Sequence, residues 1–187
     1  MSEQYSAIDI RRSYKFAFEG QSDNLEILFC KTHTYTFQTD EGCRYVLLVD
    51  EFEDIYLLGL KFYRAEDYES KHKYNVLTVH KNPFRFFSTI LCIIKEVVNS
   101  FPRHSIILKG EPTIKEIGEA ERDSKNIDDN TKRFKFYKRL LAEMVNSGSF
   151  SFLENREKSI LLLLNSATTE HEFAKIEDFL YSSGFSL

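Results

Sequence analysis

The sequence NPFRFFSTILCIIKEVVNSFPRHSIILKG, residues 82–110, predicts a helix that leads directly into a short strand. Asn82 suits the N-cap position and Pro83 suits the first helical turn, where a missing N–H group costs nothing. The apolar residues that follow at helical spacing are Phe84, Phe87, Leu91, Ile94 and Val98. We expect this row to form the buried face of the helix, and we expect the helix to end before Pro102.

The predicted strand runs from His104 to Lys109 and stops at Gly110. Its centre is apolar without alternation, and the same holds for residues 161–164. Strands of this kind are typically covered on both faces of a sheet. We therefore place both segments in the middle of the sheet, the second as part of a hairpin around Asn155.

Residues N-terminal to the helix alternate between apolar and polar side chains, which indicates half-buried strands. Four strands are predicted, over residues 14–18, 25–37, 43–50 and 55–63. Asp50, Glu51, Glu53 and Asp54 are interpreted as a solvated turn, because loops between strands are normally polar. The four strands then form an antiparallel meander.

Two more helices are predicted, over residues 131–146 and 169–181, and the polar residues 111–130 are predicted to be an acidic mobile loop. The element order indicates an α+β fold: one mostly antiparallel sheet with two to three helices packed on one face. No linker rich in Gly, Pro or Ser interrupts the order. Residues 1–187 are therefore predicted to form a single domain.

Composition limits the classes of function. The chain has 187 residues, 42% of them hydrophobic and 29% charged, which excludes wholesale disorder. A net charge of −4 excludes a uniformly basic nucleic-acid coat but permits a local basic patch. The three cysteines form no Cys-x-x-Cys pair, and the apolar runs are far shorter than a membrane span. We expect a reduced, cytoplasmic protein without membrane contact.

Most catalytic motifs are missing from the sequence. There is no Gly-rich phosphate loop and no Gly-x-Ser-x-Gly motif, and His171-Glu172 lacks the second histidine of a metalloprotease helix at Lys175. Lys61 follows the acidic turn without the acidic neighbour that a metal-dependent nuclease needs. His33 is interpreted as a hydrogen-bonded histidine within the sheet. We therefore predict no metal ligands, no cofactor and no catalytic residues.

The helix that begins near Thr131 carries five positive charges within eight residues. Lys132, Lys135, Lys138 and Arg139 gather on one side of it, at about 100° per residue. Arg133 falls instead among the apolar residues of the other side. Burying an unpaired guanidinium is expensive, so Arg133 must have a specific partner.

Two partners for Arg133 remain open. The first is an internal carboxylate, Glu111 or another acid of residues 110–130, which hold seven acids against three bases. The second is an external anion such as phosphate, held by the helix N-terminus together with Arg133 and Lys109. The candidate anion-binding or nucleic-acid-binding residues are Lys109, Lys132, Arg133, Lys135, Tyr137 and Arg139.

Four segments carry a family resemblance: Tyr74–Leu77, Asn82–Val98, the strand end Lys109–Gly110 and the helix start Thr131–Tyr137. Through them, roughly residues 10–160 resemble a family of small uncharacterised bacterial proteins, in which a strand ending Gly-Ser precedes a helix opening Arg-Thr-Arg-Leu-Tyr. The chain departs from this pattern at Glu111, where the family has serine, and in the long acidic loop. The resemblance implies a shared fold and extends to Arg133 and Tyr137; it brings no activity with it.

Three functional hypotheses follow. The first is a non-enzymatic binding module that acts through its sheet or through its basic helix, the helix contacting an anion, a nucleic acid or another protein. The second is a metal-independent ribonuclease in which Tyr137, Arg133 and Lys109 converge near His104. The third is a homo-oligomeric structural protein, in its simplest form a homodimer, because 27 Phe and Tyr residues offer ample material for an interface.

Overall fold

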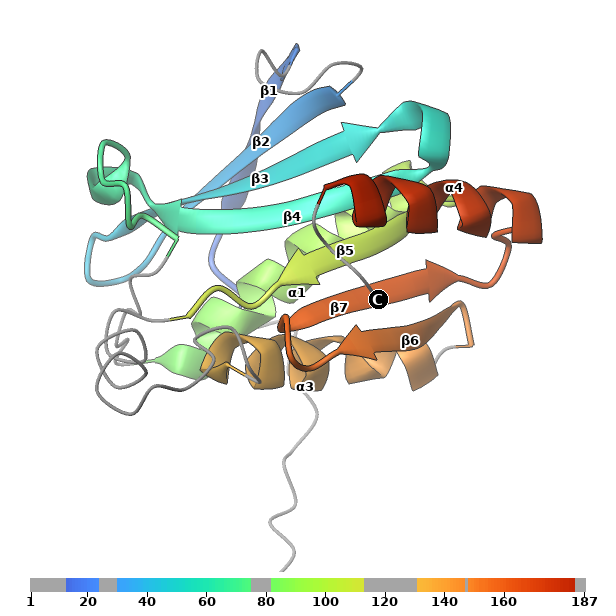
Figure 1. The fold of residues 1–187 in the computed structure, drawn as a ribbon. Coiled ribbons are helices and arrows are strands. Elements are labelled where there is room, and N and C mark those ends of the chain that lie inside the picture. Colours follow the sequence, from blue (N-terminus) through green and yellow to red (C-terminus); the bar gives the residue numbers. More distant parts are fainter. Residues whose placement is uncertain (1–12, 24–29, 75–81, 113–130, 147, 184–187) are drawn as a thin grey trace, which may run out of the picture.

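The computed structural model describes residues 13–23, 30–74, 82–112, 131–146 and 148–183. Within them, seven strands form one mostly antiparallel sheet accompanied by three α-helices, which confirms the α+β class (Figure 1). The strands are β1 Phe16–Asp23, β2 Cys30–Gln38, β3 Arg44–Phe52, β4 Leu57–Arg64, β5 Ser105–Lys109, β6 Phe150–Asn155 and β7 Ile160–Asn165. The helices are α1 Pro83–Ser100, α3 Lys132–Asn146 and α4 Glu170–Ser182. Most of the predicted acidic loop, residues 113–130, lies outside the described part, as do residues 25–29 of the second predicted strand.

The strand order is β1-β2-β3-β4-β5-β7-β6. Strands β1 to β4 form the predicted antiparallel meander, and β6 and β7 form the predicted hairpin. Strand β5 pairs with β4 in parallel, over Leu57–Gly59 and Ser105–Ile107. Helix α1 connects these two strands, since a parallel pair needs a crossover connection. The unit at residues 82–110 thus joins the two antiparallel halves of the sheet.

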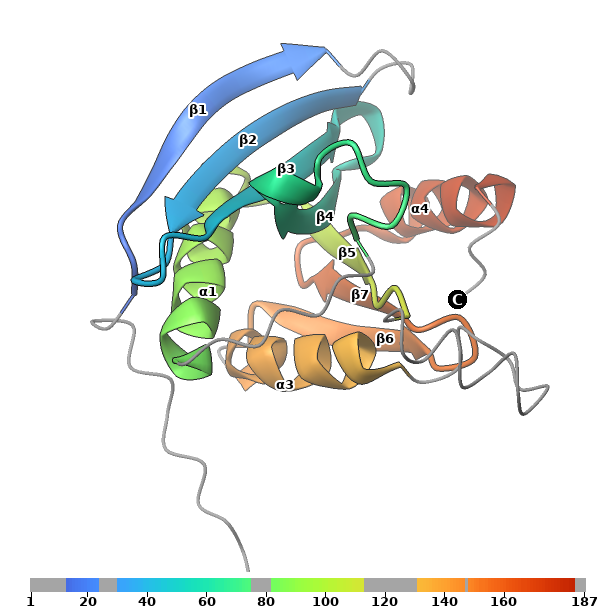
Figure 2. The same ribbon diagram turned by 90° about the vertical axis from the view of Figure 1, so that its left-hand side faces the viewer.

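The helices lie on both faces of the sheet. Helices α1 and α3 cover one face and α4 covers part of the other, as the two perpendicular views show (Figures 1 and 2). Leu91 and Leu141 belong to the large core under α1 and α3, whereas Ile176 and Leu180 belong to a smaller cluster under α4. The prediction of two to three helices on one face is met by two. Strands β5 and β7 are buried on both faces, as predicted.

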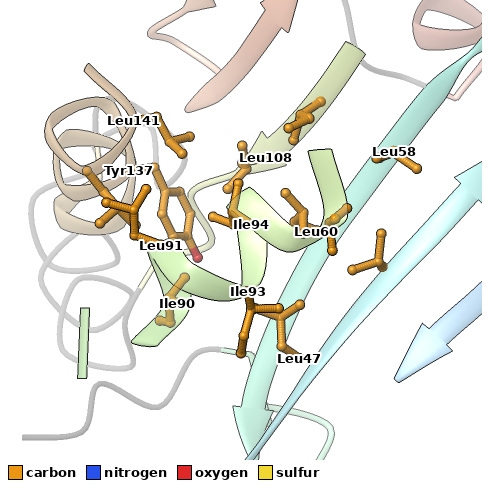
Figure 3. Packing of buried hydrophobic residues seen from close by; sticks show 14 of the residues in the cluster. Leu47, Leu58, Leu60, Ile90, Leu91, Ile93, Ile94, Leu108, Tyr137 and Leu141 are labelled. Atoms are coloured by element: carbon orange, nitrogen blue, oxygen red, sulfur yellow. The ribbon is translucent and has the colours of Figure 1, made fainter. Parts of the chain in front are cut away.

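Helix α1 begins as the sequence predicts: the Asn82 side chain accepts a hydrogen bond from the Arg85 backbone N–H at 3.1 Å. Leu91 and Ile94 are fully buried and belong to the same hydrophobic cluster as Tyr137 of α3 (Figure 3). Phe84 is 67% exposed, so its predicted place in the buried row is wrong. The buried face is instead centred on Leu91, Ile94 and their neighbours one turn away, because α1 packs against both the curved sheet and α3. None of the described helices has an apolar stretch long enough to span a bilayer.

The interpretation of Asp50, Glu51, Glu53 and Asp54 as a solvated turn is wrong for Asp50 and Glu51. Strand β3 continues to Phe52, and both carboxylates are buried on opposite faces of it. Glu51 Oε2 lies 2.7 Å from His33 Nε2, which confirms His33 as a hydrogen-bonded sheet histidine. Specific partners of this kind make it possible to bury a charge.

Candidate anion-binding cavity

A cavity of about 350 Å³ opens where β4 and β5 separate. The two strands pair only as far as Gly59 and Ile107; beyond them β4 stays with β3, while β5 stays with β7. Charged lining residues come from four segments of the chain: Asp50, Lys61, Lys109, Glu111 and Arg133. Aromatic lining residues are Phe52, Phe62, Tyr74, Tyr137 and Phe179.

The first turn of α3 is fixed to the end of β5 by hydrogen bonds. Gly110 donates its N–H to Ser159 O at 2.8 Å, and Thr131 donates its N–H to Ser159 Oγ at 2.9 Å. The Thr131 hydroxyl donates to Gly110 O and accepts from the Phe134 N–H, which makes it the effective cap of the helix. Lys109 and Arg133, which are far apart in the sequence, therefore face the same cavity.

Gly110 is required for this close approach. A β-carbon at this position would lie 2.5 Å from the Phe134 backbone nitrogen, well inside contact distance. Because the neighbouring atoms belong to the backbone of α3, they cannot rotate away. The Lys-Gly strand end in the sequence thus has a steric cause: it lets the helix carrying Arg133 start against the strand.

Arg133 is buried, with 6% of its surface exposed, on the cavity side of α3. Its guanidinium carbon lies 5.6 Å from the centre of the Phe62 ring, and its side chain donates a hydrogen bond to the Tyr137 hydroxyl. The expectation of a guanidinium held among the apolar residues of the helix is confirmed. Glu111 lines the same cavity and forms an ion pair with Lys109, at 3.1 Å.

Tyr137 remains a neutral phenol at physiological pH. Burial raises the pKa of its hydroxyl to about 12, with a further upward contribution from the Glu111 charge, while the Arg133 charge and hydrogen bond act in the opposite direction. A protonated hydroxyl can donate a hydrogen bond to an anion but cannot accept a proton from a substrate. Tyr137 is thus suited to binding rather than to base catalysis.

Asp50 and Lys61 were not among the predicted site residues. Asp50 Oδ2 lies 2.8 Å from Lys61 Nζ, and Asp50 Oδ1 accepts from the Thr32 hydroxyl at 2.7 Å. Asp50 is aligned with Gly59 across β3 and β4, and alternation places Gly59 and Lys61 on one face. This strand register could have indicated that Asp50 and Lys61 lie together. The prediction of a turn at Asp50 excluded it. No group of three potential metal ligands occurs in the described ranges.

The six predicted site residues fall into two groups. Lys109, Arg133 and Tyr137 line the cavity. Lys132, Lys135 and Arg139 are exposed on the outer side of α3. Arg133 is thus buried on the inner side of α3 while Lys132, Lys135 and Arg139 are exposed on its outer side, as the helical spacing predicted. His104, the additional residue of the ribonuclease hypothesis, is not among the described residues that line the cavity.

The aromatic lining residues form a wall of the cavity, called here the aromatic wall, that the sequence did not predict. Phe52 of β3 meets Phe179 of α4 with their ring centres 4.7 Å apart, and Phe62 meets Tyr137 edge to face at 6.2 Å. These rings come from elements that are distant in the sequence, so no local motif links them. Together with three cations and two carboxylates among the described lining residues, they suit a molecule with an apolar body and an anionic group.

No family model, curated protein or solved structure matches this chain. The resemblance to small bacterial proteins therefore stays a prediction, and the cavity is interpreted from its own residues.

Proposed function

We propose that this protein is a binding module for a small organic anion. The acidic group of the ligand lies at Lys109, Arg133 and Tyr137, and its apolar part lies against the aromatic wall. The observation that carries the proposal is that three of the six predicted binding residues line a single cavity.

The chemistry of the three groups supports an anion. A guanidinium presents a planar fork of N–H donors that matches a carboxylate or a phosphate, and hydrogen bonds between charged partners are among the strongest in proteins. Arg133 is shielded from water by its burial, which strengthens its attraction for an opposite charge. The Tyr137 hydroxyl and the Lys109 ammonium supply further donors.

The size and place of the cavity favour a small molecule over a polymer. Its volume of about 350 Å³ is at the lower end of the range for ligand sites, roughly 300–1,000 Å³. It lies beyond the paired part of two parallel strands, and crevices at the carboxyl ends of parallel strands are common ligand sites. A nucleic acid would contact the exposed outer set instead, Lys132, Lys135 and Arg139.

The ribonuclease hypothesis receives less support. Cleavage of RNA without a metal needs a group that accepts a proton near the reacting hydroxyl. The pKa of Tyr137 is about 12, so its hydroxyl keeps its proton near neutral pH and cannot be this group. His104 packs instead against Tyr56 and Phe101, with ring centres 5.5 and 5.2 Å apart.

Isothermal titration calorimetry with phenyl phosphate tests the proposal. Inorganic phosphate and phenol serve as controls, because they carry the anionic part and the aromatic part of the ligand separately. We expect saturable binding of phenyl phosphate that is weakened about tenfold or more in Arg133→Met and in Lys109→Met, since each removes a charged donor. Each half alone should bind more weakly than the whole. Arg139→Met, on the outer side of the same helix, should bind as the wild type does.

Two results would overturn the proposal. One is the absence of binding to folded wild-type protein by phenyl phosphate and by its carboxylate counterpart, benzoate. The other is binding that is lost in Arg139→Met but kept in Lys109→Met and Arg133→Met. The second pattern, especially if short single-stranded RNA binds with a steep salt dependence, would assign the function to the outer set.

A further inference from the structure

Three tyrosine rings surround one lysine ammonium at the end of β4. Lys73 Nζ lies 5.1 Å from the ring centre of Tyr63, 4.9 Å from that of Tyr68 and 5.4 Å from that of Tyr74. An ammonium within about 6 Å of a ring centre is attracted by the electron-rich face of the ring. Lys73 makes three such contacts at once, so the rings form a cage around it, called here the tyrosine cage.

The tyrosine cage is formed by one short segment, residues 63–74, and hydrogen bonds within that segment stabilise it. Tyr63 is buried near the end of β4, and the turn after it is held by Arg64, which donates to both Asp67 oxygens at 2.7 and 3.0 Å. The Tyr68 N–H donates to Ala65 O at 3.2 Å. These contacts hold the turn that connects Tyr63 with Tyr68.

The three rings lie at different angles to one another, and one of them is exposed to solvent. Tyr63 and Tyr74 stand perpendicular, at 89° with centres 5.7 Å apart, while Tyr63 and Tyr68 are tilted at 6.3 Å. Tyr68 is 59% exposed. A cation can therefore reach the rings from solvent.

We propose that the tyrosine cage is a binding site for an alkylammonium ion, and that Lys73 occupies it as an internal competitor. A quaternary ammonium has no N–H groups and gives up fewer hydrogen bonds to water than a lysine ammonium on entering such a cage, so it is the better occupant. Lys73 has the advantage of being tethered next to Tyr74, which gives it a high effective concentration at the rings. External cations bind the wild type weakly for this reason.

The tyrosine cage also adjoins the anion cavity, because Tyr74 lines both. The cage proposal is independent of the anion-binding proposal, since it rests on a different set of contacts and on a ligand of opposite charge.

Titration with choline tests the tyrosine cage, with 3,3-dimethylbutan-1-ol as the uncharged molecule of the same shape. We expect Lys73→Ala to bind choline about tenfold or more tightly than wild type, because the internal competitor is gone. The double variant Lys73→Ala, Tyr68→Ala should lose that gain, and the alcohol should not bind. Lys71→Ala, an exposed lysine in the same turn, should behave as wild type.

The proposal is overturned if folded Lys73→Ala shows no saturable binding of choline. It is overturned equally if the double variant binds as well as Lys73→Ala, or if the alcohol binds as well as choline. Tyr68 is exposed, so its replacement leaves the core intact and the test does not depend on refolding a damaged protein.

Discussion

Arg133 and Tyr137 form a coupled pair one helical turn apart on the inner side of α3. The guanidinium is buried yet lies over the Phe62 ring and donates to the phenol, so part of its cost of burial is offset by these contacts. The phenol in turn keeps its proton. The pair therefore presents a guanidinium and a protonated hydroxyl to the cavity.

His104 is a buried histidine whose pKa is shifted by its surroundings. Its two ring nitrogens have no hydrogen-bond partner within the described part of the chain, and Glu51 Oε1 is 4.0 Å from Nε2. Burial lowers the pKa of His104 below the ordinary 6.5, while the charges of Glu51 and Glu53 counteract this and Arg103 adds to it. The folded protein therefore favours the neutral form of the His104 ring.

We predict that the protein loses stability as the pH falls from 7.5 to 5.5. The unfolded chain binds a proton at His104 more readily than the folded chain, so the contribution is complete above pH 6.5 and is lost as the pH falls through the lower folded pKa. One such proton corresponds to a slope of at most about 1.4 kcal/mol per pH unit. Urea unfolding of wild type and His104→Phe measures it.

The variant should show a smaller difference between the two pH values than wild type. His72→Gln, which removes an exposed histidine, should keep the full wild-type difference. Equal pH dependence in wild type and His104→Phe would show that His104 does not carry the effect.

Among the elements, the connection from β5 to α3 decides where the cavity's charges lie. We predict that Gly110→Ala destabilises the fold by about 1–3 kcal/mol, the usual cost of overpacking, because the new methyl group meets the Phe134 backbone at 2.5 Å. It should also weaken phenyl phosphate binding by moving the first turn of α3. Chemical unfolding and titration of the same preparation measure both effects.

Gly59→Ala is the matched control. A β-carbon there lies 3.6 Å from the nearest atom, Phe52 Cε2, which is ordinary contact. This variant should be no less stable than wild type. If Gly110→Ala were as stable as Gly59→Ala, the close contact between β5 and α3 would not be a constraint of the fold.

Helix α1 shows which parts of an element can be predicted from sequence. Its start, its length and the burial of Leu91 follow from capping and periodicity. Phe84 was wrongly placed in the buried face, because a row of apolar residues does not reveal that α1 packs against both the sheet and α3. We predict that Leu91→Ala costs about 2–5 kcal/mol of folding stability. Phe84→Ala, at an exposed position, should change stability by no more than about 0.5 kcal/mol, as surface substitutions usually do.

For the whole molecule, the strands and helices were predictable because each is encoded by local periodicity, caps and turns. The cavity was predictable only in part. Arg133 stood out as a charge on an apolar helical face, and Lys109 as a charge at a strand end. Asp50, Lys61 and Phe179 had no local signal, because they meet through the pairing of β3 with β4 and the packing of α4, which depend on long-range contacts.

The most direct test of the account observes the Arg133 side chain during ligand binding. In nitrogen-15 NMR spectra, the Nε–H resonance of each arginine can be assigned from single substitutions and followed during titration with phenyl phosphate. We predict that the Arg133 resonance shifts saturably while that of Arg139, on the outer side of α3, stays unchanged. A shift at Arg139 with none at Arg133 would contradict anion binding in the cavity.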